Sequence, residues 1–235
     1  MDLTNKRILV TGGSDGIGKH ICLKLAATGA RLAILGRNAE RLEAVAQACK
    51  EAGAPEALPL TCDLQDPAAI AEVAAQVLDT FGGLDIVINN AGIWHKAGPL
   101  DTITPEMLQA TVQTNLTGLM QMTQALLPAL RENDESIVLN VVSKSGVVAQ
   151  AGQSVYTATK YGVRGFTEVL KADEAETGVR VGGLYQSGTN TEMFAKAGED
   201  VPNHIFTEPD DLADVVVFVL SRPPKLWIHD IRIEL

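Results

Sequence analysis

The segment that decides the fold of this chain begins Lys6-Arg7-Ile8-Leu9-Val10-Thr11-Gly12-Gly13-Ser14-Asp15-Gly16-Ile17-Gly18 and ends Leu32-Ala33-Ile34-Leu35-Gly36-Arg37. Its aliphatic run at residues 8–10 predicts a strand buried on both faces of a parallel sheet. Apolar or small residues then recur at helical spacing, and Gly29 ends that pattern. The segment therefore predicts a strand, a helix and a second strand, with glycines where the first strand turns into the helix.

The three glycines Gly12, Gly16 and Gly18 stand where a phosphate-binding turn needs them. Missing side chains permit a tight turn and let the backbone approach a pyrophosphate, while the helix N-terminus offers free N–H groups. The spacing Gly-x-x-x-Gly-x-Gly is one residue wider than the dinucleotide fingerprint G-x-G-x-x-G. A glycine-rich turn that only packs helix against strand is the alternative, but the strand–turn–helix setting favours a nucleotide-binding loop.

Length and composition narrow the class of protein. The 235 residues, 46% hydrophobic and 20% charged, suit one large globular α/β domain. A formal net charge of −10 argues against a nucleic acid or an anionic membrane as partner. Three scattered cysteines indicate reduced thiols in the cytoplasm, and four scattered histidines give no metal-ligand pattern. We expect neither a membrane span nor a signal peptide, because no apolar run is long enough and the first strand starts near Met1.

The rest of the chain continues to alternate between strands and helices. The predicted strands are residues 57–62, 84–88, 137–142, 179–185 and 227–235, and the predicted helices are residues 38–52, 66–81, 104–130, 154–177 and 209–221, with a partial helix at 191–197. Pro59 suggests that its strand lies near the sheet edge. This order predicts a single domain over residues 1–235, a doubly wound parallel sheet that binds ligands at its carboxyl edge.

Tyr156 and Lys160 stand four residues apart on a predicted helix, so they share one face. A nearby ammonium lowers the pKa of a phenol and makes it a better acid or base at neutral pH. Ser143, at the end of the preceding strand, can hydrogen-bond the same substrate oxygen, and Asn115 can hold a water that links Lys160 to solvent. Each residue alone also fits a purely structural role, but their joint position in a dinucleotide-type fold favours catalysis.

Together these motifs resemble those of the short-chain dehydrogenase/reductase family. The matching residues are Thr11 to Gly18, Asn89-Asn90-Ala91-Gly92, Asn115, Ser143 and Tyr156-Thr157-Ala158-Thr159-Lys160. The resemblance implies a Rossmann-type sheet in the order 3-2-1-4-5-6-7 with helices on both faces. It also implies that Tyr156 is the general acid/base, that Lys160 lowers its pKa and holds the nicotinamide ribose, that Ser143 orients the substrate, and that Asn115 serves a proton relay.

The resemblance extends to the cofactor site, with Asp63 as adenine contact, Asn89 to Ala91 beside the adenosine and ribose, and Thr191 against the cofactor. In all, the residues expected to bind cofactor are Gly12, Ser14, Asp15, Gly16, Ile17, Gly18, Arg37, Asn38, Asp63, Leu64, Asn89, Asn90, Ala91, Tyr156, Lys160, Thr189 and Thr191.

Two departures from the family pattern stand out. The family usually has Pro-Gly after the sixth strand, where the carboxamide end of the nicotinamide packs, whereas this chain has Gln186-Ser187. If Ser187 adopts a backbone angle suited to glycine, the loop is strained. The C-terminus also lacks the frequent Asp-Gly-Gly ending and has Trp227-Ile228-His229-Asp230 instead.

Cofactor choice depends on the end of the second strand. Enzymes that prefer NAD commonly place an acidic residue there, but this chain has Gly36 followed by Arg37, which can grip a 2′-phosphate and favours NADP. Ser14 and Asn38 can add hydrogen bonds. Asp15 argues against this interpretation, because NADP-preferring relatives often carry a basic residue there, and Arg37 alternatively pairs with Glu40.

The predicted function is NADP(H)-dependent interconversion of a secondary alcohol and a ketone or aldehyde. A non-catalytic dinucleotide-binding sensor or interaction protein is the alternative. Apolar residues around the predicted helix 104–130 favour a homodimer or homotetramer, unless a longer loop covers that face. Candidates for the substrate pocket are Trp94, His95, Val148, Gln150, Gln186, Met193 and Phe194; His95 is expected to be a loop residue rather than a catalyst, and Trp94 and Phe194 can equally be packing residues.

Overall fold

Seven parallel strands form one sheet in the order β3-β2-β1-β4-β5-β6-β7, as predicted. The computed structural model describes residues 1–223 and 225–234. The strands are β1 (Arg7–Thr11), β2 (Arg31–Gly36), β3 (Ala57–Thr61), β4 (Ile86–Asn89), β5 (Ser136–Val141), β6 (Val179–Gln186) and β7 (Asp230–Ile233). Strand β3, which contains Pro59, lies at the sheet edge, where the missing N–H of proline costs least.

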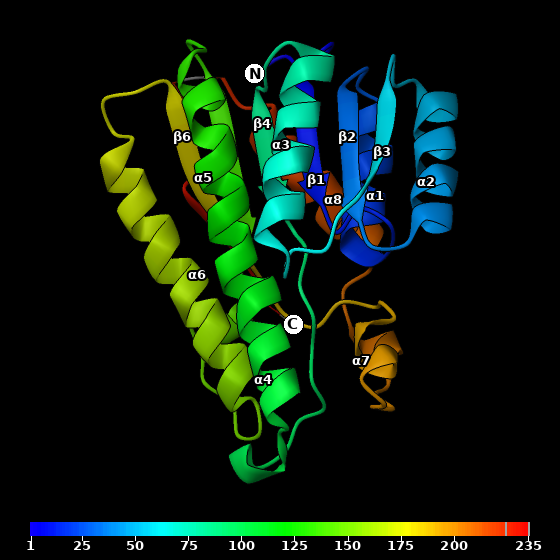
Figure 1. Cartoon of the computed structure of the whole chain (residues 1–235), viewed down its shortest axis with the longest axis vertical. Coiled ribbons are helices and arrows are strands. Elements are labelled where there is room, and N and C mark those ends of the chain that lie inside the picture. Colours follow the sequence, from blue (N-terminus) through cyan, green and yellow to red (C-terminus); the bar gives the residue numbers. More distant parts are fainter. Residues whose placement is uncertain (224, 235) are drawn as a thin grey trace.

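Helices cover both faces of the sheet (Figure 1). One face packs against α1 (Gly16–Ala26), α2 (Ala39–Ala52) and α8 (Pro209–Leu220), and the other against α3 (Pro67–Phe81), α5 (Gly118–Arg131) and α6 (Ser154–Asp173). Alternate strand residues point to opposite layers, so Ile8 and Val10 join the first core and Leu9 joins the second. Two buried layers on one sheet make a doubly wound α/β domain.

The helix boundaries follow the capping residues of the sequence. Asn38 Oδ1 accepts from the Arg41 N–H at 2.9 Å, Asp66 Oδ1 from the Ala68 N–H at 2.9 Å, and Thr104 Oγ1 from the Met107 N–H at 3.2 Å. Gly53 ends α2 with φ +119°, and Gly82 ends α3 with φ +67°, a left-handed backbone that glycine adopts without strain. These signals position the loops at the sheet edge.

The predicted helix 104–130 is present as one helical segment that contains a π-helical turn. It consists of α4 (Pro105–Val112), a π-helical turn at Gln113–Thr117, and α5. The spacing of apolar residues does not predict this π turn. Its i→i+5 hydrogen bonds insert one residue into the helix, which barely changes the helical spacing.

The predicted end of α6 and the predicted start of β7 (Asp230–Ile233) are wrong. α6 ends at Asp173 instead of residue 177, because residues 174–177 form a turn closed by the bond from Thr177 N to Glu174 O at 2.9 Å. The last strand starts at Asp230 instead of Trp227, whose indole Nε1 donates to Val181 O at 3.0 Å, and the predicted end at Leu235 lies outside the described residues.

The carboxyl ends of the parallel strands meet at one edge of the sheet. α4 and α7 (Met193–Lys196) extend beyond this edge, at the lower end of the molecule in Figure 1. The expected ligand site of a doubly wound sheet is therefore this edge.

Candidate active site

A cavity of about 1020 Å³ lies along the carboxyl edge of the sheet. Its volume is large enough for a dinucleotide together with a small substrate. The structure brings most of the predicted site residues to its walls, namely Gly12, Ser14, Asp15, Gly16, Ile17, Arg37, Asn38, Asp63, Leu64, Asn90, Ala91, Ser143, Tyr156, Lys160, Thr189 and Thr191. The remaining predicted residues, Gly18, Asn89 and Asn115, lie behind the walls.

The glycine turn between β1 and α1 fits a phosphate group. Gly12 has φ +68°, and a Cβ there would lie 2.8 Å from the Ala91 Cα. A Cβ on Gly18 would lie 2.2 Å from Gly12 O, so Gly18 is needed for close packing although it does not line the cavity. The side chain of Asp15 makes no capping hydrogen bond, so the first N–H groups of α1 have no side-chain acceptor there. A phosphate at this helix end would satisfy them.

Two neighbouring asparagines at the end of β4 have different tasks. Asn90 Nδ2 donates to Thr11 O at 3.0 Å and Gly12 O at 3.2 Å, so it braces the glycine turn from within the cavity. Asn89 points away from the cavity and donates to the Thr123 and Asn140 side chains, both at 2.9 Å. Asn89 therefore joins β4 to α5 and β5.

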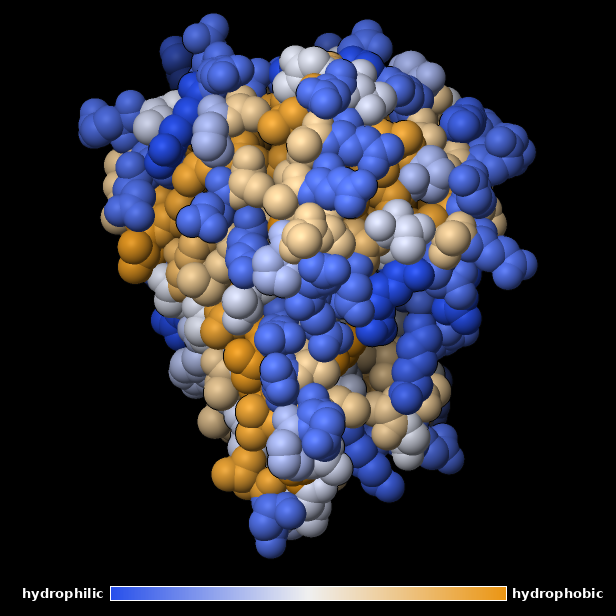
Figure 2. Space-filling view, in the orientation of Figure 1, coloured by the Kyte–Doolittle hydropathy of each residue, from blue (hydrophilic) through white to orange (hydrophobic). Residues whose placement is uncertain are grey.

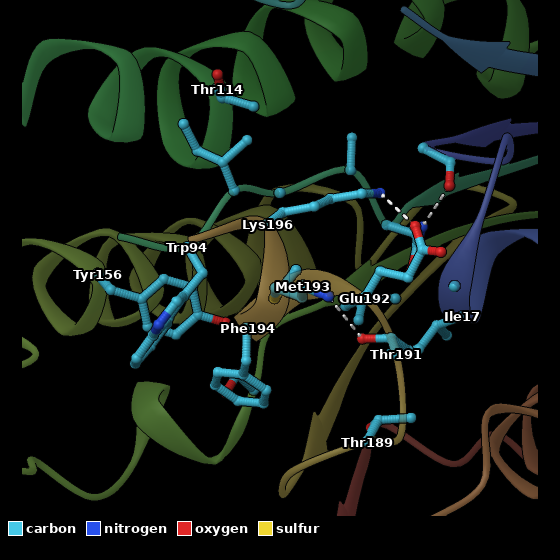
Figure 3. A pocket seen from close by; sticks show the side chains of 18 of the residues that line it. Ile17, Trp94, Thr114, Tyr156, Thr189, Thr191, Glu192, Met193, Phe194 and Lys196 are labelled. Carbon is cyan, nitrogen blue, oxygen red and sulfur yellow. Dashed lines mark hydrogen bonds and ion pairs between the residues drawn. The ribbon is translucent and has the colours of Figure 1, made fainter. Parts of the chain in front are cut away.

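Arg37 lines the cavity at the end of β2 and forms no ion pair with Glu40 within residues 1–223 and 225–234. Two further cations, which the sequence did not predict, lie here. Arg41 Nη1 lies 3.0 Å from Asp15 Oδ2, and Lys196 Nζ lies 2.5 Å from the same oxygen. Lys196, labelled in Figure 3, comes to Asp15 from α7. No sequence pattern could reveal the contact, because the two residues lie 181 positions apart.

Tyr156 and Lys160 share the inner face of α6, beside Ser143 at the end of β5. Lys160 Nζ donates to Val141 O at 3.0 Å and lies 5.6 Å from the centre of the Tyr156 ring. Ser143 has φ +110°, an unusual angle for a residue with a Cβ, while its Oγ accepts from the Ser145 N–H at 3.2 Å. The structure thus assembles a phenol, a hydroxyl and an ammonium at one cavity wall.

Burial shifts the pKa values of Tyr156 and Lys160 in opposite directions. Burial raises the pKa of Tyr156 to about 12, although a hydrogen bond with Ser143 acts in the opposite direction. Burial also lowers the pKa of Lys160 to about 8. Desolvation disfavours the charged form of both groups, and the effect of Lys160 on the pKa of Tyr156 stays a prediction.

Asn115 is fully buried in the π turn, behind the cavity wall. Its Oδ1 accepts from the Ile93 N–H at 2.7 Å, and its Nδ2 donates to Ile93 O at 2.9 Å. A Cβ on Gly92 would lie 3.4 Å from Asn115 Oδ1 and 3.8 Å from Lys160 Nζ. Asn115 therefore holds the loop after β4 beside Lys160, and its predicted relay role stays a prediction.

Aromatic rings line the cavity beyond Tyr156 (Figure 3). The Trp94 ring lies edge-on to Tyr156 at 4.6 Å and to Phe194 at 5.4 Å between ring centres. Glu199 Oε2 accepts from Trp94 Nε1 at 3.0 Å, and Glu199 Oε1 accepts from the Ala97 N–H. These contacts join the segment after β6 to the loop after β4 across the cavity.

Most predicted pocket residues line this region: Trp94, Gln150, Gln186, Met193 and Phe194. Two do not. Val148 is 44% exposed outside the cavity, and His95 is buried with its Nε2 accepting from the Tyr156 N–H at 3.3 Å. His95 thus supports the start of α6, as expected of a loop residue. Strain at Ser187 is also absent, since Asn5 and Ser143 are the non-glycine residues with positive φ in the described chain.

Comparisons with known proteins agree with this geometry. The family model for short chain dehydrogenase matches residues 6–202. A short chain dehydrogenase of Monascus purpureus is 32% identical over 228 residues, which cover 95% of this chain and 78% of that protein. Dehydrogenase/reductase SDR family member 7B of Bos taurus is 34% identical over 182 residues, or 75% of this chain, and the aligned part spans 56% of that relative's length.

Solved structures match over nearly the whole chain. A short chain dehydrogenase from Burkholderia cenocepacia in complex with NADP has a TM-score of 0.87 and 33% identity, with 100% of this chain and 98% of that chain covered. A 3-ketoacyl-(acyl-carrier-protein) reductase from Brucella melitensis complexed with NADH has a TM-score of 0.87 and 30% identity, with 98% of each chain covered.

Fold and site together define an α/β oxidoreductase with a nicotinamide dinucleotide cofactor. The chain belongs to the short-chain dehydrogenase/reductase family. Within the described residues, no helix is both long and apolar enough to cross a membrane.

Proposed function

We propose that this protein uses NADP(H) to interconvert a secondary alcohol and a ketone or aldehyde, with Tyr156 as general acid/base. The observation that carries the proposal is the position of Tyr156, Ser143 and Lys160 in the same cavity as the glycine turn of α1. A cofactor with its phosphates at that turn can extend along the cavity wall toward Tyr156. The bound nicotinamide would supply or accept the hydride.

The chain's own residues would handle the proton and the substrate oxygen. With a pKa of about 12, the Tyr156 phenol is protonated at neutral pH, as a proton donor for carbonyl reduction must be. The Ser143 hydroxyl can hydrogen-bond the same carbonyl oxygen and hold it toward Tyr156. With a pKa of about 8, Lys160 keeps its charge at neutral pH and can donate hydrogen bonds to the ribose hydroxyls.

The preference for NADP rests on the cations at the end of β2. Arg37 lies at the cavity without an acidic partner among the described residues, and Arg41 follows one helical turn later. Asp15 opposes a phosphate, but its charge is offset by Arg41 and Lys196. The NADP complex of the relative from Burkholderia cenocepacia supports this choice, whereas the NADH complex of the Brucella melitensis reductase does not.

Michaelis constants for both cofactors test this preference. The parent should have the lower Michaelis constant for NADP. Arg37→Ala should raise the Michaelis constant for NADP about 10-fold, because one charge-assisted contact is lost, and should change that for NAD little. A parent that already prefers NAD would contradict the proposal.

Tyr156→Phe tests the chemistry. The change removes only the hydroxyl, so cofactor binding should survive while turnover on a panel of ketones and alcohols falls by about 100-fold or more. Turnover comparable to that of the parent would remove Tyr156 from the mechanism. Unchanged cofactor affinity in the variant is the control for an intact fold.

We also propose a homo-oligomer in the cytoplasm. A groove of about 460 Å³ lies on the outer face of α5 and α6, with Met120, Leu127 and Phe166 in its walls. Figure 2 shows hydrophobic side chains among the polar ones on the left of the molecule, over these helices. Light scattering should give a mass of two or four chains. The cytoplasmic location is supported by three cysteines that are all buried and unbridged.

A further inference from the structure

Four aromatic rings gather at the cavity, beside the reacting hydroxyls. The chain has only two tryptophans, three tyrosines and five phenylalanines, yet Trp94, Tyr156, Phe194 and Phe206 all line this one cavity. Figure 3 shows Trp94 and Phe194 on the side of Tyr156, away from Ile17 of the glycine turn. The rings therefore belong to the part of the cavity in which a substrate reaches Tyr156.

These rings form one continuous wall that starts at Tyr156. The ring centres of Trp94 and Tyr156 are 4.6 Å apart, those of Trp94 and Phe194 are 5.4 Å apart, and those of Phe194 and Phe206 are 5.5 Å apart. Each spacing lies in the range in which aromatic rings attract each other through their faces and edges. A further ring placed against this wall would gain the same attraction.

Other contacts fix the orientation of the rings in the protein alone. The Trp94 indole donates from Nε1 to Glu199 Oε2 at 3.0 Å, and the His95 ring lies parallel to the indole at 5.8 Å between ring centres. Phe206 packs against the backbone at Gly188, where a Cβ would lie 2.5 Å from Phe206 Cδ1. A preformed surface of this kind binds a flat ring without the ordering cost that a flexible chain would add.

The loop after β5 and the start of α6 contribute polar groups to the cavity instead. Ser145 Oγ donates to Gln153 Oε1 at 3.0 Å, Gln153 Nε2 donates to Gln150 Oε1 at 2.7 Å, and all three residues line the cavity. The Ser145 N–H donates to Ser143 Oγ at 3.2 Å, so this polar chain starts beside a reacting hydroxyl. A large apolar substituent would remove these groups from water, which is unfavourable. The apolar part of a substrate therefore belongs against the rings.

We propose that the substrate is an aryl ketone, or the corresponding benzylic alcohol, whose aromatic ring binds against Trp94 and Phe194. This inference deepens the proposed function and rests on it. Because the Trp94 ring contacts the Tyr156 ring, an aryl group against Trp94 brings the neighbouring carbonyl oxygen next to the phenol. The second substituent of the ketone is small and faces the polar chain of Ser145 and Gln153.

Two ketones with the same carbon skeleton test the proposal. Acetophenone has a flat aromatic ring where cyclohexyl methyl ketone has a saturated one. The measured quantity is the ratio of their kcat/KM values, acetophenone over cyclohexyl methyl ketone, in the parent and in Trp94→Leu. Leucine keeps an apolar surface and removes the ring, so the ratio should fall about 3- to 10-fold in the variant. The intrinsic reactivity of the two ketones cancels, because both enzymes act on the same pair.

The ratio also separates substrate recognition from packing, since a purely structural role of Trp94 would lower both kcat/KM values equally. Phe218→Leu is the matched control. Phe218 lies on α8, outside the cavity, and is 51% exposed, so its replacement should leave both kcat/KM values unchanged. If Trp94→Leu has no cooperative thermal transition, Phe194→Leu replaces it and should lower the ratio in the same direction.

The outcomes separate this inference from the proposed function. A ratio that stays the same or rises in Trp94→Leu or its replacement would overturn the aryl ketone assignment. A parent that acts on other ketones but not on acetophenone would also overturn it, while the proposed function stands. Turnover of no ketone or alcohol in the wider panel, by a parent that binds cofactor, would overturn the proposed function itself.

Discussion

Replacing Ser143 separates the strain of its backbone from the chemistry of its hydroxyl. Ser143 has φ +110° and ψ 153°, a region that residues with a Cβ occupy at a cost of about 1–3 kcal/mol. Three hydrogen bonds hold it there: its N–H donates to Leu184 O, its carbonyl accepts from the Gly146 N–H, and its Oγ accepts from the Ser145 N–H. The surrounding loop therefore imposes this angle.

The two smallest residues respond differently at this position. Ser143→Ala loses the bond to Ser145, worth about 1 kcal/mol, and keeps the Cβ that causes the strain. Ser143→Gly loses the same bond but releases about 1–3 kcal/mol of strain, reduced by about 0.5–1 kcal/mol for the freer unfolded chain. The glycine variant should therefore be more stable than the alanine variant by up to about 2.5 kcal/mol.

Urea unfolding of both variants measures this difference, provided that their m values agree. Asn5 supplies the control, because its φ of 59° lies in the left-handed region that asparagine tolerates. Asn5→Gly should therefore gain little stability relative to the parent. A Ser143→Gly variant no more stable than Ser143→Ala would refute backbone strain at Ser143. Turnover should fall in both variants, because both lack the hydroxyl.

Three further changes test other parts of the site. Lys160→Met should be more stable than the parent at pH 8. Its advantage in unfolding free energy should shrink by about 1–3 kcal/mol toward pH 10.5, because the Lys160 pKa of about 8 in the folded chain lies below the unfolded value of 10.5. Urea unfolding at each pH measures this free energy. Glu199→Ala should shift the emission maximum of Trp94 by removing its acceptor, whereas Glu199→Gln keeps an acceptor and should shift it less. Asn115→Ala should lower the unfolding free energy by about 2–4 kcal/mol, because both of its bonds to Ile93 are lost in a buried turn; unchanged stability would contradict this role.

The sequence predicted the strand order, the family and the oxidoreductase class, and all three are confirmed. The strand order followed from the resemblance to the family, whereas the strands and helices themselves were predicted from local patterns: aliphatic runs, glycines at the strand exit, and capping residues such as Asn38 and Asp66. Each pattern acts within a few residues of itself, so it can be read along the chain. NADP preference, the oligomer and the roles of Asn115, Ser143, Tyr156 and Lys160 stay predictions.

The sequence by itself determined which residue types follow each strand, and therefore which of them reach the carboxyl edge. Only the tertiary structure decided what surrounds them there. Lys196 meets Asp15, and Glu199 meets Trp94, across gaps of 181 and 105 residues that no local pattern encodes. Likewise, burial raises the pKa of Tyr156 and lowers that of Lys160, because desolvation depends on every segment packed around a group rather than on its neighbours in sequence.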